Sequence, residues 1–459
     1  MNPVVVIGGG WAGCAAAVEL AKAGHRVVVH EAAPTLGGRA RCVVRDGLPL
    51  DNGEHLLLGA YVDTIDLASS VRDRDEPAAF TTSPLALRPF GARNAQRLSF
   101  VTREAPGPLG LLAGLATAGG LGAFDRARLL AWFAAQRRKG WRCDPALTVT
   151  ELLASQPAVM RDELWQPLCL AALNTPPSRA SAQIFLNVLR ESFGAGAKAT
   201  SLVTPQSGLG DAIPEACARW LRARGHDVEV RTRSRVTTIG NDIVGESSRG
   251  SFRAKAVVVA VGPHQLAAAF DAGASGDPGV RRALECVAAL RYEPITTLYL
   301  GYDAAVTLPP GLLRLENGPG QWIFDRSDIL RRAPPSGARS AMRALVSVVI
   351  SASGAHDALD HDALVAATDA QLRSLEPTLP KRVFAQVIAE KRATYAAEPE
   401  LVRPAAGRLA CGVYLAGDYT YGDFPATLEA AVRSGRIAAA AVNRDFAATA
   451  AARDSIRAP

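Results

Sequence analysis

Cysteine is scarce in this chain of 459 residues, and its pattern excludes two kinds of site. The seven cysteines are spread over the whole length, and no two of them form a CxxC pair. An odd and scattered set argues against a disulfide framework and against a zinc site, so we expect no bound metal. It also fits a reducing compartment, and we expect a cytoplasmic protein.

Long runs of one charge are also missing. The formal net charge is +7, yet the basic residues are scattered, and only short clusters such as 137–139 and 331–332 stand out. A nucleic-acid-binding protein usually gathers such charge in a stripe. We therefore expect no nucleic-acid partner, and we keep a weak attraction to the anionic headgroups of a membrane surface as an open alternative.

The sequence also lacks a leader and a clear membrane span. Met1 is followed almost directly by an apolar run typical of a strand, so we expect no signal peptide. The uncharged stretch 105–124 is nearly long enough to span a bilayer, but its six glycines and two prolines disfavour insertion. Either a packed loop and helix or a surface-dipping element of a substrate channel is expected there.

Residues 1–31 predict a strand, a helix and a second strand, with three glycines at the first turn. Gly8 permits the tight turn, Gly10 lets the backbone approach a pyrophosphate, and Gly13 permits close packing of helix on strand. The start of the helix then offers free N–H groups to the anion. Glu31 ends the second strand, where a carboxylate accepts hydrogen bonds from an adenosine ribose. The segment therefore predicts a dinucleotide site.

A diglycine and an arginine follow this acid closely. Gly37, Gly38 and Arg39 bring free backbone and a guanidinium within reach of the same pyrophosphate. Because domains that bind only nicotinamide cofactors do not usually have this feature, it favours FAD over NAD.

A second glycine–acid pair stands near the other end of the chain. An apolar strand at 413–416 leads into Gly417 and Asp418, and a helix is expected from 430 to 442. Asp418 is placed to bond a ribityl hydroxyl, and N–H groups near Thr427 are placed to face the flavin ring. The helix dipole there favours negative charge on a reduced flavin.

The layered pattern of the first residues returns twice later in the chain, at about 205–264 and 408–446. We therefore expect a discontinuous domain interleaved with a second one. The expected FAD-binding domain comprises residues 1–84, 201–265 and 401–446, the expected substrate-binding domain comprises 85–200 and 266–400, and 447–459 forms a C-terminal tail.

Together these blocks resemble the flavin-containing amine oxidase and phytoene desaturase superfamily over most of the chain. The resemblance implies an α/β fold, with a Rossmann-like FAD-binding domain and an interleaved α+β substrate domain, as in amine oxidases and GDP-dissociation inhibitors. It implies an FAD-dependent oxidoreductase. The implied cofactor contacts are Gly8, Gly10, Gly13, Glu31, Gly38, Arg39, Val236, Gly417, Asp418 and Thr427, with the backbone of Val236 meeting the adenine.

Four further segments narrow the resemblance to the squalene-associated members, and within them to the hydroxysqualene dehydroxylase family. They are Leu50–Tyr61, Tyr292–Leu300, Gln321–Arg326 and Glu390–Tyr395. Members of this family remove an allylic hydroxyl from a C30 isoprenoid, with reduced FAD as the hydride source, to give squalene for hopanoid synthesis. The family usually carries glutamine where this chain has Glu54, which puts a role built on that side chain in doubt.

Such a reaction needs a proton donor for the departing hydroxyl and a site that excludes water. His55 is the first candidate because histidine titrates near neutrality. Glu54 is a second candidate if burial raises its pKa. Tyr395 is a further candidate, with Tyr419 beside it as an option. For each, a purely structural role is the alternative.

The implied partners are a long apolar isoprenoid substrate and an unidentified reductant for the flavin. We expect an apolar tunnel that opens towards a membrane, with the 105–124 stretch and a helix over 126–133 as candidates for its entrance. A carotenoid or phytoene desaturase is the enzymatic alternative, because the sequence does not set the direction of electron flow. A non-catalytic isoprenoid-binding protein of the GDP-dissociation inhibitor type is the alternative of another class.

Overall fold

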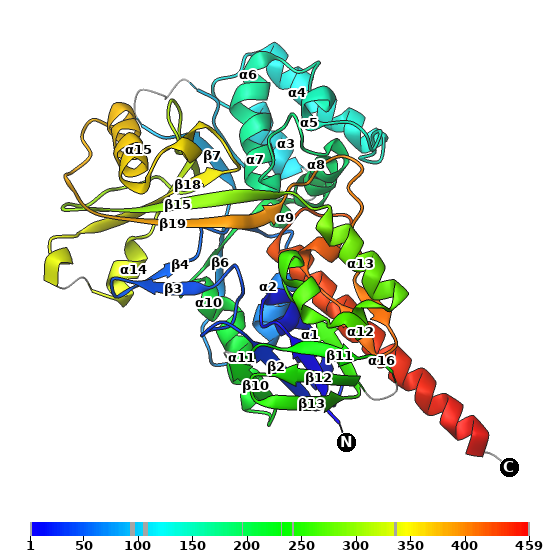
Figure 1. Ribbon diagram of the computed structural model, residues 1–459. Helices are drawn as coiled ribbons and strands as arrows, with labels where there is room; N and C mark the ends of the chain where they lie inside the picture. The colour runs from blue at the N-terminus through cyan, green and yellow to red at the C-terminus, as the bar shows by residue number, and fades with distance from the viewer. Residues whose placement is uncertain are drawn as a thin grey trace.

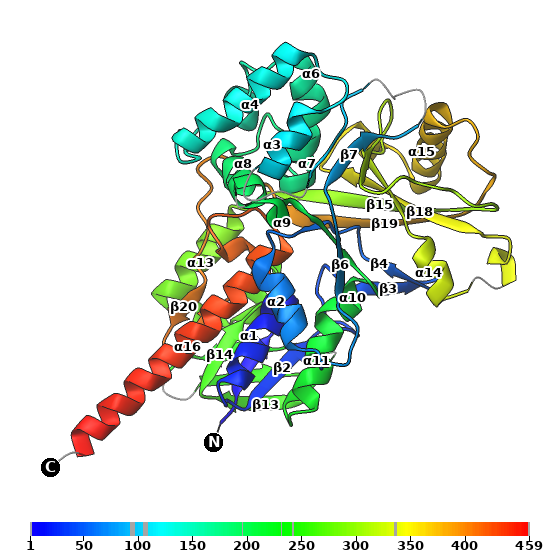
Figure 2. The same ribbon diagram turned by 180° about the vertical axis from the view of Figure 1, so that it is seen from behind.

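The computed structural model describes residues 2–91, 97–103, 109–194, 196–230, 232–240, 243–334 and 337–457. This part of the chain forms two lobes, each built around a β-sheet (Figure 1). The lower lobe contains both termini, and the upper lobe combines a second sheet with a group of helices. Seen from behind, the long last helix, α16, runs from the junction of the lobes down past the lower sheet (Figure 2).

Six strands form the lower sheet in the order β10–β2–β1–β14–β21–β20, all parallel except the edge strand β20. Their bounds are β1 Val4–Ile7, β2 Val27–Glu31, β10 Asp227–Val230, β14 Ala256–Val259, β20 Gly407–Ala410 and β21 Val413–Leu415. The apolar, β-branched runs of β1 and β14 are buried on both faces, as central parallel strands require. The expected Rossmann-like α/β arrangement is confirmed.

Different layers cover the two faces of this sheet. On one face, Val4 and Val6 pack against α1 (Trp11–Lys22), α11 (Pro214–Arg222) and α16 (Leu428–Arg457). On the other face, Val5 and Ile7 pack towards a small antiparallel sheet and α13. The elements of that layer are β11 Arg235–Thr238, β12 Ile243–Ser247, β13 Gly250–Ala254, α12 Ala272–Ser275 and α13 Pro278–Ala288.

Helix α16 is longer than the sequence suggested. Of the expected tail 447–459, residues 447–457 continue the helix, and 458–459 lie outside the described residues. The extension is rich in alanine, which has the highest helix propensity, so the helix does not need tertiary contacts along its whole length. Near its start, Gly435 allows close packing on α1, because a Cβ there would lie 2.2 Å from the carbonyl oxygen of Ala12.

The upper sheet has seven strands in the order β19–β15–β18–β17–β16–β7–β8 and is largely antiparallel. Their bounds are β7 Ala86–Pro89, β8 Phe100–Val101, β15 Tyr292–Tyr302, β16 Leu312–Arg314, β17 Trp322–Asp325, β18 Ala344–Ser351 and β19 Arg382–Tyr395. Side chains alternate along β15. Leu298 and Leu300 pack in the core beneath α15 (His361–Leu375), whereas Thr297 and Tyr299 face the segment 51–54, which lies between the lobes.

A group of short helices completes the upper lobe. Their bounds are α3 Leu109–Ala116, α4 Ala123–Arg138, α5 Val149–Leu152, α6 Ala158–Met160, α7 Gln166–Leu173, α8 Ala182–Leu189 and α9 Ala197–Thr200, with π-helical turns at Arg161–Trp165 and Arg190–Gly194. Leu111 and Leu115 of α3 are buried. Residues 116–117 and 122–124 of the 105–124 stretch are exposed, so its role as a surface-dipping element stays a prediction, and 105–108 lie outside the described residues.

Small elements link the lobes. They are β3 Cys42–Arg45, β4 Leu48–Asp51, β5 Leu57–Leu58, α2 Val62–Ser70, β6 Phe80–Ser83, β9 Leu202–Pro205, α10 Leu209–Ala212 and α14 Ser327–Arg332. We keep the domain division given above as a proposal; the strands of the six-stranded sheet all come from its three FAD-binding segments. No helix in the described ranges is both long enough and apolar enough to cross a membrane.

A buried glutamate joins α16 to α2, and its loss is expected to destabilise the protein. The Glu429 carboxylate accepts hydrogen bonds from the N–H groups of Asp63 and Thr64, in the first turn of α2, and pairs with Arg433 at 2.9 Å. Glu429→Ala removes these acceptors and should lower the free energy of unfolding by about 3–5 kcal/mol. Chemical denaturation measures this free energy of unfolding. The exposed Glu76→Ala is the control, and equal losses in both variants would contradict the expectation.

Candidate functional site

The start of α1 is a buried helix terminus without a cap. Gly10 precedes the helix and offers no side-chain cap, and the first turn carries no acidic residue. Trp11, Ala12 and Gly13 are buried, so water does not replace the missing cap. Free N–H groups and the positive end of the helix dipole are therefore held together in the interior. Such a terminus fits the diphosphate of FAD.

The glycines around this terminus divide into two kinds. Gly8 has φ +106°, and a Cβ on it would lie 2.5 Å from the carbonyl oxygen of Ala260. A Cβ on Gly13 would lie 1.9 Å from the carbonyl oxygen of Gly8, so helix and strand touch there. By contrast, a Cβ on Gly10 would meet nothing nearer than the Cα of Gly38, at 3.9 Å. Gly8 and Gly13 thus serve chain packing, while Gly10 leaves room for a ligand.

Glu31 stands at the carboxyl end of β2, tied to the glycine loop. Its Oε2 accepts a hydrogen bond from the N–H of Gly9 at 2.7 Å, and its Oε1 accepts one from Ala33 at 2.7 Å. Each carboxylate oxygen has a second lone pair, which remains suited to a ribose hydroxyl. The ribose contact itself stays a prediction.

Arg39 and Asp418, which the sequence places at opposite ends of the chain, form an ion pair. A guanidinium nitrogen of Arg39 lies 2.7 Å from Oδ1 of Asp418, and another donates to the carbonyl oxygen of Ala393 at 2.7 Å. Burial alone would lower the pKa of Arg39, but Asp418 and Glu390 outweigh it and the pKa is raised. The pair fixes the position of the Arg39 guanidinium. This positively charged group lies on the side where the predicted pyrophosphate and ribityl contacts meet.

The remaining cofactor candidates lie on the same framework. The N–H of Gly417 donates to Oγ of Ser434, and Oγ1 of Thr427 accepts from the N–H of Ala430 at the start of α16. Val236 is buried in β11. Their contacts with FAD stay predictions. Tyr419 adds a polar atom: its hydroxyl is buried and has no hydrogen-bond partner in the described part of the chain.

Glu54 lies in a buried charge network that the sequence did not reveal. Its two oxygens accept hydrogen bonds from Arg326 at 2.9 Å and from the hydroxyl of Ser347 at 2.7 Å. Arg326 also holds Asp51, at 2.7 Å. Burial would lower the pKa of Arg326, but Glu54 and Asp51 raise it on balance. Both oxygens of the Glu54 carboxylate are therefore already hydrogen-bonded, one to the Arg326 guanidinium and the other to the Ser347 hydroxyl.

His55 follows Glu54 and is half-buried. Its Nδ1 lies 3.0 Å from the carbonyl oxygen of Gly53, so in the neutral ring Nδ1–H is the donor. Nε2 has no hydrogen-bond partner within the described ranges and is free to meet a ligand. Burial lowers the pKa of His55 below its usual 6.5, although the Gly53 carbonyl and the charges of Asp51 and Glu54 act in the opposite direction.

Tyr395 is fully enclosed at the end of β19. Its hydroxyl donates to the carbonyl oxygen of Phe424 at 2.9 Å and accepts a hydrogen bond from Arg403. Burial raises its pKa above the usual range. Arg403 also lies over the tyrosine ring at 4.9 Å, a cation–π contact. Sequence reasoning missed Arg403, because nothing local pairs it with Tyr395.

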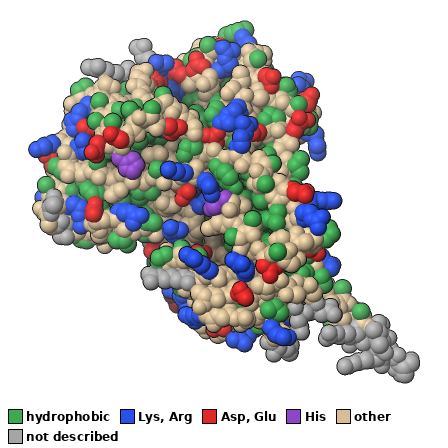
Figure 3. Space-filling model, viewed as in Figure 1, with side chains coloured by type: hydrophobic (Ala, Val, Ile, Leu, Met, Phe, Trp, Pro, Cys, Tyr) green, Lys and Arg blue, Asp and Glu red, His purple; other side chains and the backbone are tan. Residues whose placement is uncertain are grey.

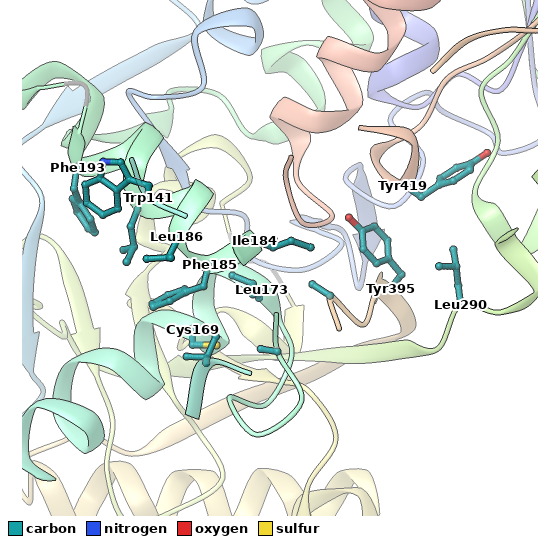
Figure 4. Close-up of a cluster of buried hydrophobic side chains, with 14 of the residues drawn as sticks. Trp141, Cys169, Leu173, Ile184, Phe185, Leu186, Phe193, Leu290, Tyr395 and Tyr419 are labelled. Carbon is teal, nitrogen blue, oxygen red and sulfur yellow. The ribbon is translucent and has the colours of Figure 1, made fainter. Parts of the chain in front are cut away.

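A belt of buried apolar side chains leads away from Tyr395 into the upper lobe. Figure 4 shows Leu173, Ile184, Phe185 and Leu186 between Tyr395 at one end and an aromatic group at the other. These side chains come mainly from α7 and α8. These side chains form one closely packed hydrophobic cluster, and the expected apolar tunnel stays a prediction.

The helix over 126–133, expected as a tunnel entrance, places its aromatics inside. Trp132 and Phe133 are buried in α4 and pack on Trp165, at ring-centroid distances of 4.7 and 5.7 Å. The exposed aromatic of this helix is instead Phe124. The large residues of this helix point inward because they belong to the hydrophobic core of the upper lobe.

The surface between the lobes is hollowed, and Lys and Arg side chains stand on both sides of the hollow (Figure 3). Cationic rims of this kind attract anionic ligands such as a dinucleotide. Within the described ranges, no cluster of histidine, cysteine and carboxylate side chains has the geometry to hold a metal ion.

Comparisons with known proteins place this geometry in context. The family model for flavin-containing amine oxidoreductases matches residues 11–443. A protein named hydroxysqualene dehydroxylase, from Rhodopseudomonas palustris, is 30% identical and aligns over 95% of this chain and 97% of its own. A zeta-carotene desaturase from Synechocystis is 23% identical over 96% of both chains. A crystal structure of an oxidoreductase from Methanosarcina mazei matches with a TM-score of 0.69 at 16% identity, over 96% of this chain and 99% of that chain.

Gly13→Ala tests the turn between β1 and α1 that is expected to hold the diphosphate. Its Cβ would collide with the carbonyl oxygen of Gly8, forcing α1 away from β1, and such overpacking costs about 1–3 kcal/mol. We expect the purified variant to retain much less FAD, measured as flavin absorbance per protein, and to melt at a lower temperature. Gly240→Ala is the control, because its Cβ meets nothing within 4 Å. A Gly13 variant that stays as yellow as the wild type would refute the role of this contact.

Proposed function

This protein belongs to the flavin-containing amine oxidoreductase family, and from that premise we propose that it reductively removes the allylic hydroxyl of hydroxysqualene to give squalene. It is an FAD-dependent oxidoreductase. The observation that carries the finer assignment is the relationship to the Rhodopseudomonas protein of that name, which spans nearly the whole of both chains. The apolar belt of the upper lobe supports it, since the substrate is an oil-like chain with one hydroxyl.

The reaction sets three demands on the protein. The C–O bond breaks, the hydroxyl leaves with an added proton as water, and a hydride completes the new C–H bond. Bound FAD in its reduced form supplies that hydride. The chain must supply the proton and exclude water, because water would capture an allylic cation. The belt between α7 and α8 and Tyr395 meets the second demand.

His55 is the proton donor that this arrangement favours. Its Nε2 is free, whereas the oxygens of Glu54 and the hydroxyl of Tyr395 are already bonded to neighbours. The imidazolium form donates from Nε2 while Nδ1 keeps its bond to the Gly53 carbonyl. Glu54 and Tyr395 rank below His55, since either would first have to break existing bonds.

A product analysis tests the function directly. The purified protein is incubated without oxygen, with its flavin reduced, and given hydroxysqualene, and the products are identified by mass spectrometry. Squalene is expected. A parallel incubation of the oxidised protein with phytoene and with zeta-carotene tests the desaturase alternative, which the Synechocystis relative favours. New double bonds in the carotenoids without squalene formation would overturn the proposal.

The role of His55 makes a pH dependence testable. Because the folded pKa lies below 6.5, the imidazolium fraction rises as the pH falls through that value. Single-turnover rates should therefore increase with falling pH, with a midpoint below 6.5. His55→Gln should lower the rate about 10²- to 10⁴-fold and abolish the midpoint. The exposed His361→Gln on α15 is the control, and an unchanged pH profile in the His55 variant would rule out this donor.

A further inference from the structure

Helix α4 presents an unusual outward face on the upper lobe. Four exposed cations gather at and just beyond its carboxyl end, here called the α4 cation cluster: Arg137, Arg138, Lys139 and Arg142. None of the four is ion-paired within the part of the chain that the structure describes. The only acid of α4, Asp125, is half-buried near the opposite end. The exposed Asp144 lies two residues beyond Arg142, so the cluster keeps an excess of three positive charges over this acid.

The rest of this outward face is mostly apolar. Phe124 stands at the amino end of α4 with 72% of its surface exposed, and Arg128 lies over its ring at 5.7 Å. Between the two ends the exposed positions are Arg128 and three alanines, Ala127, Ala131 and Ala134. Both ribbon views place α4 along the outer edge of the molecule, away from the termini (Figures 1 and 2). A helix with cations and an exposed aromatic suits a lipid headgroup layer.

The α4 cation cluster lies directly above one end of the apolar belt. Trp141, between Lys139 and Arg142 in the sequence, is buried and packs on Phe133, which in turn packs on Phe193. In Figure 4, Trp141 and Phe193 mark the end of the belt farthest from Tyr395 and Tyr419. Apolar side chains thus run from beneath the cations to the cofactor side of the upper lobe.

A purely structural explanation accounts for part of this pattern. Cations near the carboxyl end of a helix are stabilised by its dipole. That effect explains neither Arg142, which lies beyond the helix, nor an exposed phenylalanine at the other end. A nucleic acid would match the charge, but not an outward surface of alanines and a phenylalanine.

We propose that the α4 cation cluster and Phe124 dock this protein on an anionic membrane surface, on the side of the upper lobe where the apolar belt ends. The role of the belt in taking up a membrane-dissolved isoprenoid rests on the proposed function. The docking itself rests only on the charge and exposure of α4. Phosphatidylglycerol headgroups supply the complementary charge, and Phe124 inserts at the boundary between headgroups and acyl chains.

Vesicle flotation of the holoenzyme tests the docking. Vesicles of phosphatidylcholine alone are compared with vesicles that also contain phosphatidylglycerol. We expect binding only to the anionic vesicles and release by high salt. A triple variant, Arg137→Gln, Arg138→Gln and Lys139→Gln, should bind on the order of 100-fold more weakly, since each cation near an anionic surface contributes about fivefold. Phe124→Ser should weaken binding without changing the charge.

The matched control removes the same charge elsewhere. Arg222→Gln, Arg282→Gln and Arg331→Gln replace three exposed cations on other faces. If this control loses as much affinity as the α4 variant, the attraction is a property of net charge and the proposal fails. It also fails if the wild type ignores anionic vesicles, if it binds phosphatidylcholine equally well, or if a DNA duplex competes it off the vesicles.

Turnover in detergent separates this proposal from the proposed function. The α4 triple variant should convert detergent-dispersed hydroxysqualene at the wild-type rate and slow only with substrate supplied in anionic vesicles. A melting temperature equal to that of the wild type shows that the variant is folded. Vesicle binding by a protein that forms no squalene would overturn the function and leave the docking intact.

Discussion

The contact on which the rest of the site depends is the ion pair between Arg39 and Asp418. These residues are 379 positions apart, yet they meet because each follows a strand of the same parallel sheet, β2 and β21. In such a sheet the carboxyl ends of the strands lie along one edge, where ligands bind. The uncapped start of α1 opens at that edge as well. A diphosphate therefore finds helix N–H groups and a guanidinium already assembled.

The charge network of Arg326 plays a similar part for the loop that carries His55. Arg326 follows β17 in the upper sheet and holds both Asp51 and Glu54, which lie at and just beyond the end of the linking strand β4. The carboxylate of Glu54 is balanced by the Arg326 guanidinium and the Ser347 hydroxyl. Breaking one partner of such a buried network leaves an uncompensated charge, so the loop is held firmly.

The sequence predicted what depends on local patterns and missed what depends on distant pairing. The glycines of the first turn, the buried runs of β1 and β14 and the acid of Glu31 have local signatures, so the sequence predicted them. Nothing near Arg326 in the sequence points to Asp51, and no periodicity shows that Trp132 faces inward while Phe124 faces solvent. The end of α16 was placed too early, because alanine extends a helix without apolar periodicity.

His55 shows how two demands of the proposed chemistry oppose each other. An apolar, water-poor site protects a cationic intermediate, but the same burial lowers the pKa of the imidazole and disfavours the charged form that donates a proton. The neighbouring carboxylates of Asp51 and Glu54 offset part of this, and Arg326 fixes them in place. A glutamate at position 54 therefore acts through its charge, which a glutamine would lack. In the proposed reaction Glu54 would thus support His55 through its charge and would not itself donate the proton.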